Sequence, residues 1–334
     1  MESNLDEVQK LKTMRVLSGI QPSGILHIGN YLGMMRQMVE LQAGHELFCF
    51  IADLHAMTSL NRGADLRANT LQAALDFLAL GIDPERSVFW VQSTVPEINE
   101  LTWYLSNVTP VGLLERCHSY KDKLAKGLPA NAGLLNYPAL MAADILAVQS
   151  DIVPVGKDQK QHLEVTRDIA LKFNHEFGET FKIPDALIKE EVAIVPGTDG
   201  QKMSKSYGNT IEIFGEEKAI RKQVMNIVTD STPLEQPKNP ETCNVFEIYA
   251  LFAAPEQKAE MAQKYRAGGF GYGDAKKATF ALLWEYFRPY RERRAELSQN
   301  LDAVQKILQK GTDKARVEIS KTLQIVREKT GAFL

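Results

Sequence analysis

Cysteine is scarce in this sequence. The 334 residues include three cysteines, Cys49, Cys117 and Cys243, and no two of them form a Cys-x-x-Cys pair. This spacing argues against a zinc or iron–sulfur site and favours a reducing, cytoplasmic compartment. No segment approaches the run of about 18 apolar residues that a membrane span needs. The acidic N-terminus lacks the apolar core of a signal peptide. We therefore expect a cytoplasmic protein with no membrane partner.

Neither sign of charge dominates the chain. It has 39 Lys and Arg residues against 42 Asp and Glu residues, and a formal net charge of −3. Residues 215–334 hold 20 basic and 16 acidic residues, so the C-terminal part is mildly basic and the remainder is acidic. This asymmetry permits a polyanion partner at the C-terminal part, although solvated helix faces explain it more simply.

Apolar segments and helical periodicity alternate in the first third of the chain. Three short apolar segments, at 15–19, 47–51 and 87–92, are separated by helical patterns after Gly29 and over 69–80. Such alternation without hairpin turns predicts an α/β fold with a parallel sheet. Ligands bind beyond the carboxyl ends of the strands in these sheets. Residues 18–23 and 53–55 fall at such ends.

The pattern of the remaining residues predicts mostly helix. Residues 97–175 and the chain from about 216 onward have helical patterns, with Thr312 predicted to cap the last helix and Gly331 to end it. At roughly 150 residues per domain, the length predicts two domains. We expect an N-terminal extension over 1–13, a Rossmann-like parallel-sheet domain over 14–214 with a helical insertion at about 97–185, and an all-helical domain over 215–334.

Two loops contain residues suited to binding phosphate. The loop at 18–30 has glycines at 19, 24 and 29 and leads into a helix, where backbone N–H groups attract anions, and His27 could donate to a phosphate oxygen. It matches neither the dinucleotide fingerprint nor the Walker A pattern, and a tight strand-to-helix turn explains it more simply. The second loop, Lys202-Met203-Ser204-Lys205-Ser206, carries two ammonium groups that could stabilise a leaving pyrophosphate. A solvated charged loop is the alternative.

Together the two loops resemble the signature motifs of class I aminoacyl-tRNA synthetases. The segment His27-Ile28-Gly29-Asn30 resembles their HIGH-type motif, and residues 202–206 match their KMSKS motif in full. The intervening segments 135–146 and 153–162 resemble those of the bacterial tryptophanyl-tRNA synthetases. The likeness runs from about residue 15 to the C-terminus and becomes diffuse after residue 215.

The resemblance implies roles for residues at a tryptophan site. Asp144, a carboxylate inside an apolar run, would accept the indole N–H. Burying a carboxylate without a partner costs free energy, so a substrate that lacks the N–H would leave Asp144 unsatisfied. A carboxylate turned to solvent or paired with a lysine is the alternative. Met141, one helical turn earlier, would line the same pocket. Tyr137 and Gln159 would hold the ammonium group of the amino acid. His55 is a further candidate, although His55 and His162 could equally be structural histidines.

The resemblance also implies an ATP site. His27, Lys123, Lys202 and Lys205 would stabilise the phosphates, and Mg²⁺ would arrive with the ATP phosphates, so no resident metal is expected. The residues implied to contact ATP are Gln21, Pro22, Ser23, Gly29, Asn30, Gly156, Lys157, Asp158, Val192, Lys202, Met203, Ser204, Lys205 and Ser206.

The implied activity is the two-step joining of L-tryptophan to tRNA-Trp through tryptophanyl-adenylate. The implied C-terminal domain reads the anticodon, and the implied assembly is a homodimer with no DNA partner. Three positions depart from the family pattern: Leu17 replaces an aromatic residue, Leu54 a glutamine and His27 a threonine. A tyrosyl-tRNA synthetase and a non-catalytic paralogue that binds RNA or protein are the alternatives.

Overall fold

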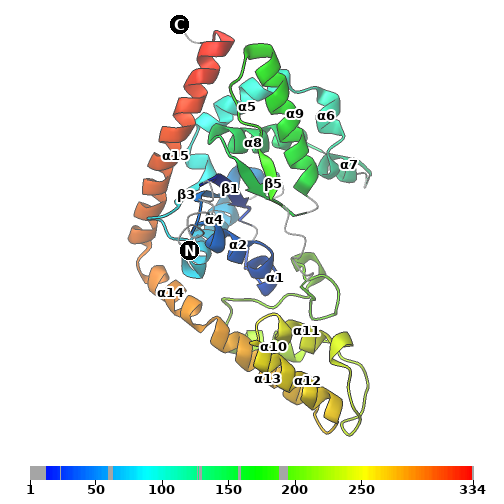
Figure 1. Cartoon of the computed structure of the whole chain (residues 1–334). Helices are drawn as coiled ribbons and strands as arrows, with labels where there is room; N and C mark the ends of the chain where they lie inside the picture. Colours follow the sequence, from blue (N-terminus) through cyan, green and yellow to red (C-terminus); the bar gives the residue numbers. More distant parts are fainter. Residues whose placement is uncertain are drawn as a thin grey trace, which may run out of the picture.

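A five-stranded parallel sheet forms the centre of the N-terminal part of the chain (Figure 1). The computed structural model describes residues 13–22, 24–58, 63–125, 127, 130–156, 159–187 and 195–332. The strand order is β3-β2-β1-β4-β5, and every neighbouring pair is parallel. The predicted Rossmann-like sheet is therefore confirmed. The strands are β1 (Arg15–Ile20), β2 (Glu46–Ile51), β3 (Val88–Val91), β4 (Ile152–Pro154) and β5 (Asp185–Leu187).

Each face of the sheet has its own apolar core. Successive side chains of a strand point to opposite faces, and in β1 Val16 contributes to one core and Leu17 to the other. The register keeps neighbours on the same face, since Val16 lies beside Leu47 and Leu17 beside Phe48. Burial on both faces explains why these strands are uniformly apolar.

The prediction of helical structure over 97–175 is wrong where β4 lies, and β5 was missed as well. Each strand is three residues long, and β4 pairs with β1 only at Ile152, opposite Val16. Asp185 at the start of β5 is exposed. Segments this short show no measurable period and, in the case of β5, no apolar run. Only pairing with a neighbouring strand makes them strands.

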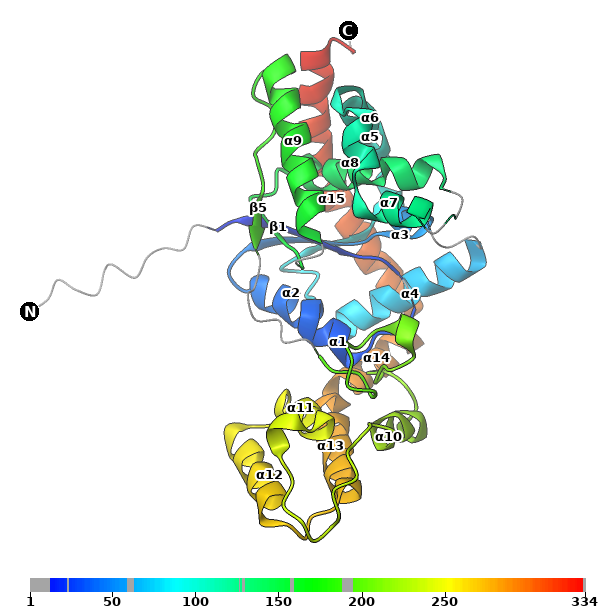
Figure 2. The same cartoon turned by 90° about the vertical axis from the view of Figure 1, so that its right-hand side faces the viewer.

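Helices cover both faces of the sheet (Figures 1 and 2). One core includes Met38 and Phe77 from helices on one face, and the other includes Leu101 and Phe173 from helices on the opposite face. The elements are α1 (Ile28–Asn30), the π-helix η1 (Tyr31–Met35), α2 (Arg36–Leu41), α3 (Asp53–Ala56), α4 (Gly63–Leu80), the 3₁₀ helix η2 (Gln92–Thr94), α5 (Glu97–Val108), α6 (Val111–Glu115), α7 (His118–Ala125), α8 (Ala132–Ala147), α9 (Lys160–Phe177) and the 3₁₀ helix η4 (Lys205–Tyr207).

The described residues from 215 to 332 form helices and no strand, as predicted. The prediction of helix throughout is nevertheless wrong over 226–239, where the chain is irregular. There the ammonium group of Lys238, which is 4% exposed, donates to the carbonyls of Pro233, Leu234 and Gln236. The loop thus folds around one buried cation. The helical elements are α10 (Glu217–Met225), the 3₁₀ helix η5 (Pro240–Thr242), α11 (Asn244–Ala250), α12 (Pro255–Ala267), α13 (Tyr272–Tyr286), α14 (Arg288–Gln299) and α15 (Leu301–Thr330).

Helix α15 leaves the other C-terminal helices and runs back along the sheet (Figure 1). Thr312 does not cap it, because the helix begins eleven residues earlier, where the Asn300 side chain accepts from the backbone N–H of Ala303. Thr312 lies in the helix interior, and its hydroxyl is 2.7 Å from that of Thr94. Gly331, at a φ of 70°, ends the helix as predicted.

A glycine brings α15 onto the edge strand of the sheet. A Cβ added to Gly311 would lie 1.8 Å from the backbone oxygen of Phe89 in β3. The helix backbone therefore rests directly on the strand. Covering an edge strand in this way also shields it from pairing with other chains.

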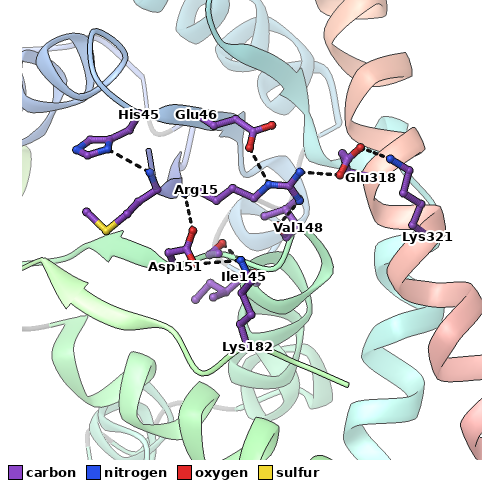
Figure 3. Close-up of polar contacts among 11 residues, drawn as sticks. Arg15, His45, Glu46, Ile145, Val148, Asp151, Lys182, Glu318 and Lys321 are labelled. Atoms are coloured by element: carbon purple, nitrogen blue, oxygen red, sulfur yellow. Dashed lines mark hydrogen bonds and ion pairs between the residues drawn. The ribbon is translucent and has the colours of Figure 1, made fainter. Parts of the chain in front are cut away.

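Arg15 of β1 connects this strand to α15 through an ion pair (Figure 3). Its guanidinium contacts Glu46 of β2 at 2.8 Å and Glu318 of α15 at 2.8 Å, and it donates to the carbonyl of Val148 at 3.1 Å. Its backbone N–H donates to Asp151, which also pairs with Lys182. Arg15 thus joins three parts of the chain that are distant in sequence.

The predicted boundary at 214/215 stays a prediction, but α15 belongs spatially to the sheet. Ala315, Ile319, Leu323 and Val326 of this helix lie in the same core as Leu17 and Phe48. Among the described residues, no helix combines the length and apolar character that crossing a bilayer demands.

Candidate active site

The carboxyl ends of the three adjacent strands β1, β2 and β3 bring polar residues to one edge of the sheet. Gln21 and Pro22 follow β1, α3 with Asp53 and His55 follows β2, and Gln92 follows β3. The sequence predicted a ligand at this edge, and the candidates Gln21, Pro22 and His55 lie there.

Asp144 lies at the centre of a buried polar cluster, which we call the Asp144 cluster and which comprises His55, Gln92 and Asp144. The Asp144 side chain is 4% exposed. Its Oδ2 accepts from His55 Nε2 at 2.9 Å, and Gln92 Nε2 donates to Oδ1 at 2.9 Å and to Oδ2 at 2.8 Å. Asp144 is therefore neither turned to solvent nor paired with a lysine.

Two opposing effects act on the Asp144 carboxyl. Burial raises its pKa, and the hydrogen bonds from His55 and Gln92 oppose that rise without cancelling it. When the carboxyl is ionised it can only accept hydrogen bonds, and the His55 tautomer with its proton on Nε2 then donates to it. The contacts from His55 and Gln92 offset part of the cost of burying that charge.

Tyr137, Met141 and Asp144 share one face of α8, at positions i, i+4 and i+7. The Tyr137 hydroxyl bonds His162 Nε2, and His162 Nδ1 lies 3.0 Å from Gln159 Oε1. The two residues predicted to hold the ammonium group are thus connected through a buried histidine. The His55 and Tyr137 rings meet edge to face with centroids 6.2 Å apart. This contact joins the Asp144 cluster to the Tyr137 end of the site.

The sequence placed Asp53 at this edge without giving it a role, and it gave no role to Gln92 or Ser93. Asp53 accepts from the Ser93 backbone N–H at 2.9 Å and from the Ser93 hydroxyl at 2.5 Å. These hydrogen bonds connect the turn after β2 to the turn after β3. A usable signal was present, because Gln92 ends the predicted strand 87–92 and Ser93 follows it, on the edge where ligands bind.

The loop containing His27 is held against the segment that follows the KMSKS loop. The Ile28 N–H donates to the Ile211 carbonyl at 3.0 Å, and the Ile213 N–H donates to the Leu26 carbonyl at 3.2 Å. A Cβ on Gly29 would lie 2.9 Å from His27 Nδ1 and 3.5 Å from Met203 Cβ. The glycine therefore makes room for the His27 ring of the same loop, while Met203 of the second loop lies at an ordinary contact distance. Asn30 accepts from the His27 backbone N–H.

His27 is 6% exposed, and burial, followed by the positive charge of Lys205, lowers its pKa to about 4. The folded state therefore favours the neutral ring, while the unfolded chain takes up a proton near pH 6.5. Below that pH the unfolded state binds more protons, so the free energy of unfolding falls as the pH falls toward 4.

His27→Gln is expected to reduce this pH dependence. Between about pH 6.5 and pH 4.5 the unfolding free energy of the variant should fall less steeply than that of the wild type, by at most about 1.4 kcal/mol per pH unit. Urea denaturation at three pH values in this range measures the difference. Parallel curves for the two proteins would show that His27 is not held neutral.

An internal asparagine shapes the KMSKS loop. Asn209, which is 2% exposed, accepts from the Ser204 N–H at 2.8 Å and donates to the Lys202 carbonyl at 3.1 Å and to Asp199 Oδ1 at 2.7 Å. Met203 is buried, and the Ser204 and Ser206 hydroxyls lie 2.8 Å apart. The exposed side chains of Lys202 and Lys205 thus extend from a loop that is fixed from within.

Asp76 connects Lys205 to the C-terminal helices by charge. Asp76, on α4, is 5% exposed and pairs with Arg294 of α14 at 2.5 Å. The guanidinium of Arg294 also lies over the Phe214 ring, 5.0 Å from its centroid. Burial raises the pKa of Asp76, and the charges of Arg294 and Lys205 oppose that rise. Although Lys205 is exposed over much of its surface, the partial desolvation of its ammonium group lowers its pKa, and the charge of Asp76 opposes that change.

The remaining predicted residues fall into two groups. Gly156 follows β4, and Lys123 lies in α7, so both come from the predicted helical insertion. Neither Lys123 nor Lys202 forms an ion pair with any of the described residues. Four predicted ATP contacts, Ser23, Lys157, Asp158 and Val192, lie outside the described residues.

A sequence model of the class I tRNA synthetases (W and Y) matches residues 9–288, a span that includes both phosphate loops and the Asp144 cluster. The chain belongs to this family.

Several relatives match this synthetase over nearly its full length. The tryptophan–tRNA ligase of Fusobacterium nucleatum is 59% identical over 317 residues, which cover 93% of this chain and 97% of that protein. The tryptophan–tRNA ligase of Rhodopirellula baltica is 56% identical, covering 95% of this chain and 99% of that one. The crystal structure of Campylobacter jejuni tryptophanyl-tRNA synthetase with ADP and tryptophan has a TM-score of 0.92 and 55% identity, and covers 95% of this chain and 100% of its own.

Proposed function

We propose that this chain joins L-tryptophan to tRNA-Trp in two steps that use one molecule of ATP. The observation that carries this proposal is the Asp144 cluster, a buried acceptor held on the same helix face as Tyr137 and Met141. Full-length likeness to tryptophan–tRNA ligases at 55–59% identity supports the same activity.

The tryptophan end of the site is formed by Asp144, Met141, Tyr137, Gln159 and His55. In this proposal Asp144 accepts the indole N–H, and Met141 and His55 contact the ring. Tyr137 and Gln159, connected through His162, bind the ammonium group. An amino acid without the N–H leaves the buried Asp144 oxygen unsatisfied, which gives the site its selectivity.

The ATP end is formed by the two packed loops. Backbone groups around Gly29, with Gln21, Pro22, Ser23 and Asn30, contact ATP in this proposal. Lys202, Lys205, Lys123 and His27 face the phosphates. The other proposed contacts are Gly156, Lys157, Asp158, Val192, Met203, Ser204 and Ser206. Mg²⁺ enters as the partner of the ATP phosphates and neutralises part of their charge.

The chemistry needs positioning and charge stabilisation but no covalent nucleophile from the protein. A carboxylate oxygen of tryptophan attacks the α-phosphorus of ATP, the bond to the bridging oxygen of the β-phosphate breaks, and pyrophosphate leaves. Lys202 and Lys205 stabilise the negative charge that develops on this leaving group. A ribose hydroxyl of the terminal adenosine of tRNA-Trp then attacks the tryptophan carbonyl, and AMP leaves.

The proposed assembly is a homodimer that works in the cytoplasm, where tRNA is used. The helices between residues 215 and 299 are the proposed surface for the anticodon, since RNA is usually read through unstacked bases and phosphates. The basic excess of residues 215–334 lies mostly in α15, because residues 215–299 hold 13 basic and 12 acidic residues, so this placement does not rest on charge. Sedimentation of the active enzyme tests the dimer, and an active monomer would contradict it.

Amino-acid-dependent exchange between ATP and pyrophosphate tests the activity. With the wild-type protein we expect rapid exchange with tryptophan and a rate at least about 100-fold lower with tyrosine, because tyrosine has no indole N–H for Asp144. Exchange with tyrosine instead would assign the chain to the tyrosyl enzymes. No exchange with either amino acid would favour a paralogue that binds RNA or protein without catalysis.

A further inference from the structure

Gln92 is anchored at both ends of its side-chain amide. Its side chain is fully buried, its Nε2 donates to both oxygens of Asp144, and its Oε1 accepts from the Leu54 backbone N–H at 3.2 Å. A backbone N–H can only donate, so the oxygen end of the amide must face Leu54 and the NH₂ end must face Asp144. The orientation of the amide is therefore determined by its surroundings.

The backbone on both sides of this amide is fixed as well. The Leu54 N–H also donates to Asp53 Oδ1 at 3.1 Å, and Asp53 in turn accepts from the backbone and hydroxyl of Ser93, the residue after Gln92. The turns after β2 and β3 are thus connected directly beneath the Asp144 carboxylate. A side chain held at this point has little freedom to move away from Asp144.

Counting hydrogen bonds on Asp144 shows where a ligand can bind. Each carboxylate oxygen can accept about two hydrogen bonds. Among the described residues, Oδ2 has two donors, His55 and Gln92, whereas Oδ1 has Gln92 alone. One acceptor position on Oδ1 remains, and its direction depends on how Gln92 holds the plane of the carboxylate.

We propose that Gln92 is a positioning residue that holds the Asp144 carboxylate so that Oδ1 accepts the indole N–H of tryptophan. The inference rests on the proposed function, because it assigns the indole contact to Asp144. Gln92 acts through Asp144 and touches no reacting atom. Removing Gln92 should therefore lower the preference for amino acids with an indole N–H more than it lowers the rate of adenylate formation.

The test compares tryptophan with its isostere in which sulfur replaces the indole N–H, using ATP–pyrophosphate exchange. The wild type should prefer tryptophan strongly in kcat/KM. Gln92→Met keeps the length of the side chain and removes the donor. It should lower kcat/KM for tryptophan about tenfold, mainly through KM, and change that for the sulfur analogue by less than about threefold. Equal losses for both amino acids would overturn the proposal.

Gln92→Asn provides a second variant in case Gln92→Met folds poorly. It keeps the amide but is one methylene shorter, so it cannot reach both the Leu54 N–H and Asp144, and the same loss of preference is expected. Gln42→Met is the matched control. Gln42 is also buried and bonded at both ends, to the Gly81 carbonyl and to the Asp83 N–H, away from the Asp144 cluster. Its substitution should leave the preference for tryptophan unchanged.

Asp144→Ala, which has no side-chain acceptor, distinguishes the indole contact from the role of Gln92. If this variant loses the preference for tryptophan over the sulfur analogue and the Gln92 variants keep it, the role of Gln92 is wrong while the indole contact stands. If Asp144→Ala keeps the preference, the indole contact and the role of Gln92 are both wrong.

Discussion

Replacing Asp144 by alanine is expected to lower kcat/KM for tryptophan in ATP–pyrophosphate exchange by about 10³-fold, which corresponds to about 4 kcal/mol. Two effects contribute. The indole N–H loses its acceptor, and the buried donors of His55 and Gln92 lose theirs. An unsatisfied buried polar group costs about 1–3 kcal/mol, so the loss exceeds that of one hydrogen bond to the substrate.

A control carboxylate shows whether the effect is specific to the site. Asp185→Ala removes an exposed aspartate on β5 that pairs with Arg167. Exposed pairs contribute at most about 1 kcal/mol to stability, so we expect exchange activity within about twofold of the wild type. Thermal unfolding of both variants identifies any loss that arises from misfolding. If Asp144→Ala activates tryptophan at a rate near that of the wild type, the assignment of the indole contact to Asp144 is wrong.

Gly311→Ala is expected to destabilise the protein by about 3 kcal/mol, although alanine is the better helix former. The added Cβ would lie 1.8 Å from the Phe89 oxygen and 2.6 Å from the Phe89 carbonyl carbon. These are backbone atoms of a paired strand, and they cannot rotate away as a side chain could. Either α15 moves off the sheet or β3 shifts, and both changes disrupt the packing of Ala315 and Ile319.

Urea denaturation of Gly311→Ala measures the cost, and Gly273→Ala is its matched control. Gly273 lies in α13, where an added Cβ meets no atom within 4 Å. That substitution should be neutral or should stabilise the protein by up to about 1 kcal/mol, through helix propensity alone. If the two variants unfold at the same urea concentration, the direct packing of α15 on β3 is not what holds the helix.

Several parts of the fold could be predicted because they depend on local patterns. The strands β1, β2 and β3 are buried on both faces, which makes them continuous apolar segments bounded by turns. Gly331 ends α15 because glycine adopts the left-handed conformation without strain. The three-residue strands β4 and β5 left no such pattern, since only pairing with a neighbour defines them.

The candidate site also contains residues that local patterns predict and residues that they do not. Both phosphate loops and Asp144 could be recognised from their own residues, because glycines, paired lysines and a carboxylate in an apolar run are each visible locally. The donors around Asp144 could not. His55 and Gln92 are 89 and 52 residues away from it along the chain, and a contact at that separation depends on how β2 and β3 end beside α8.

Residue types at fixed spacing are enough to predict the strands β1 to β3, the two phosphate loops and the family of this protein. Other features depend on contacts between distant parts of the folded chain. The tertiary structure placed α15 against β3 through Gly311, and it surrounded Asp144 with His55 and Gln92. The physical reason is burial, because a carboxylate removed from water must find donors from wherever the chain can bring them.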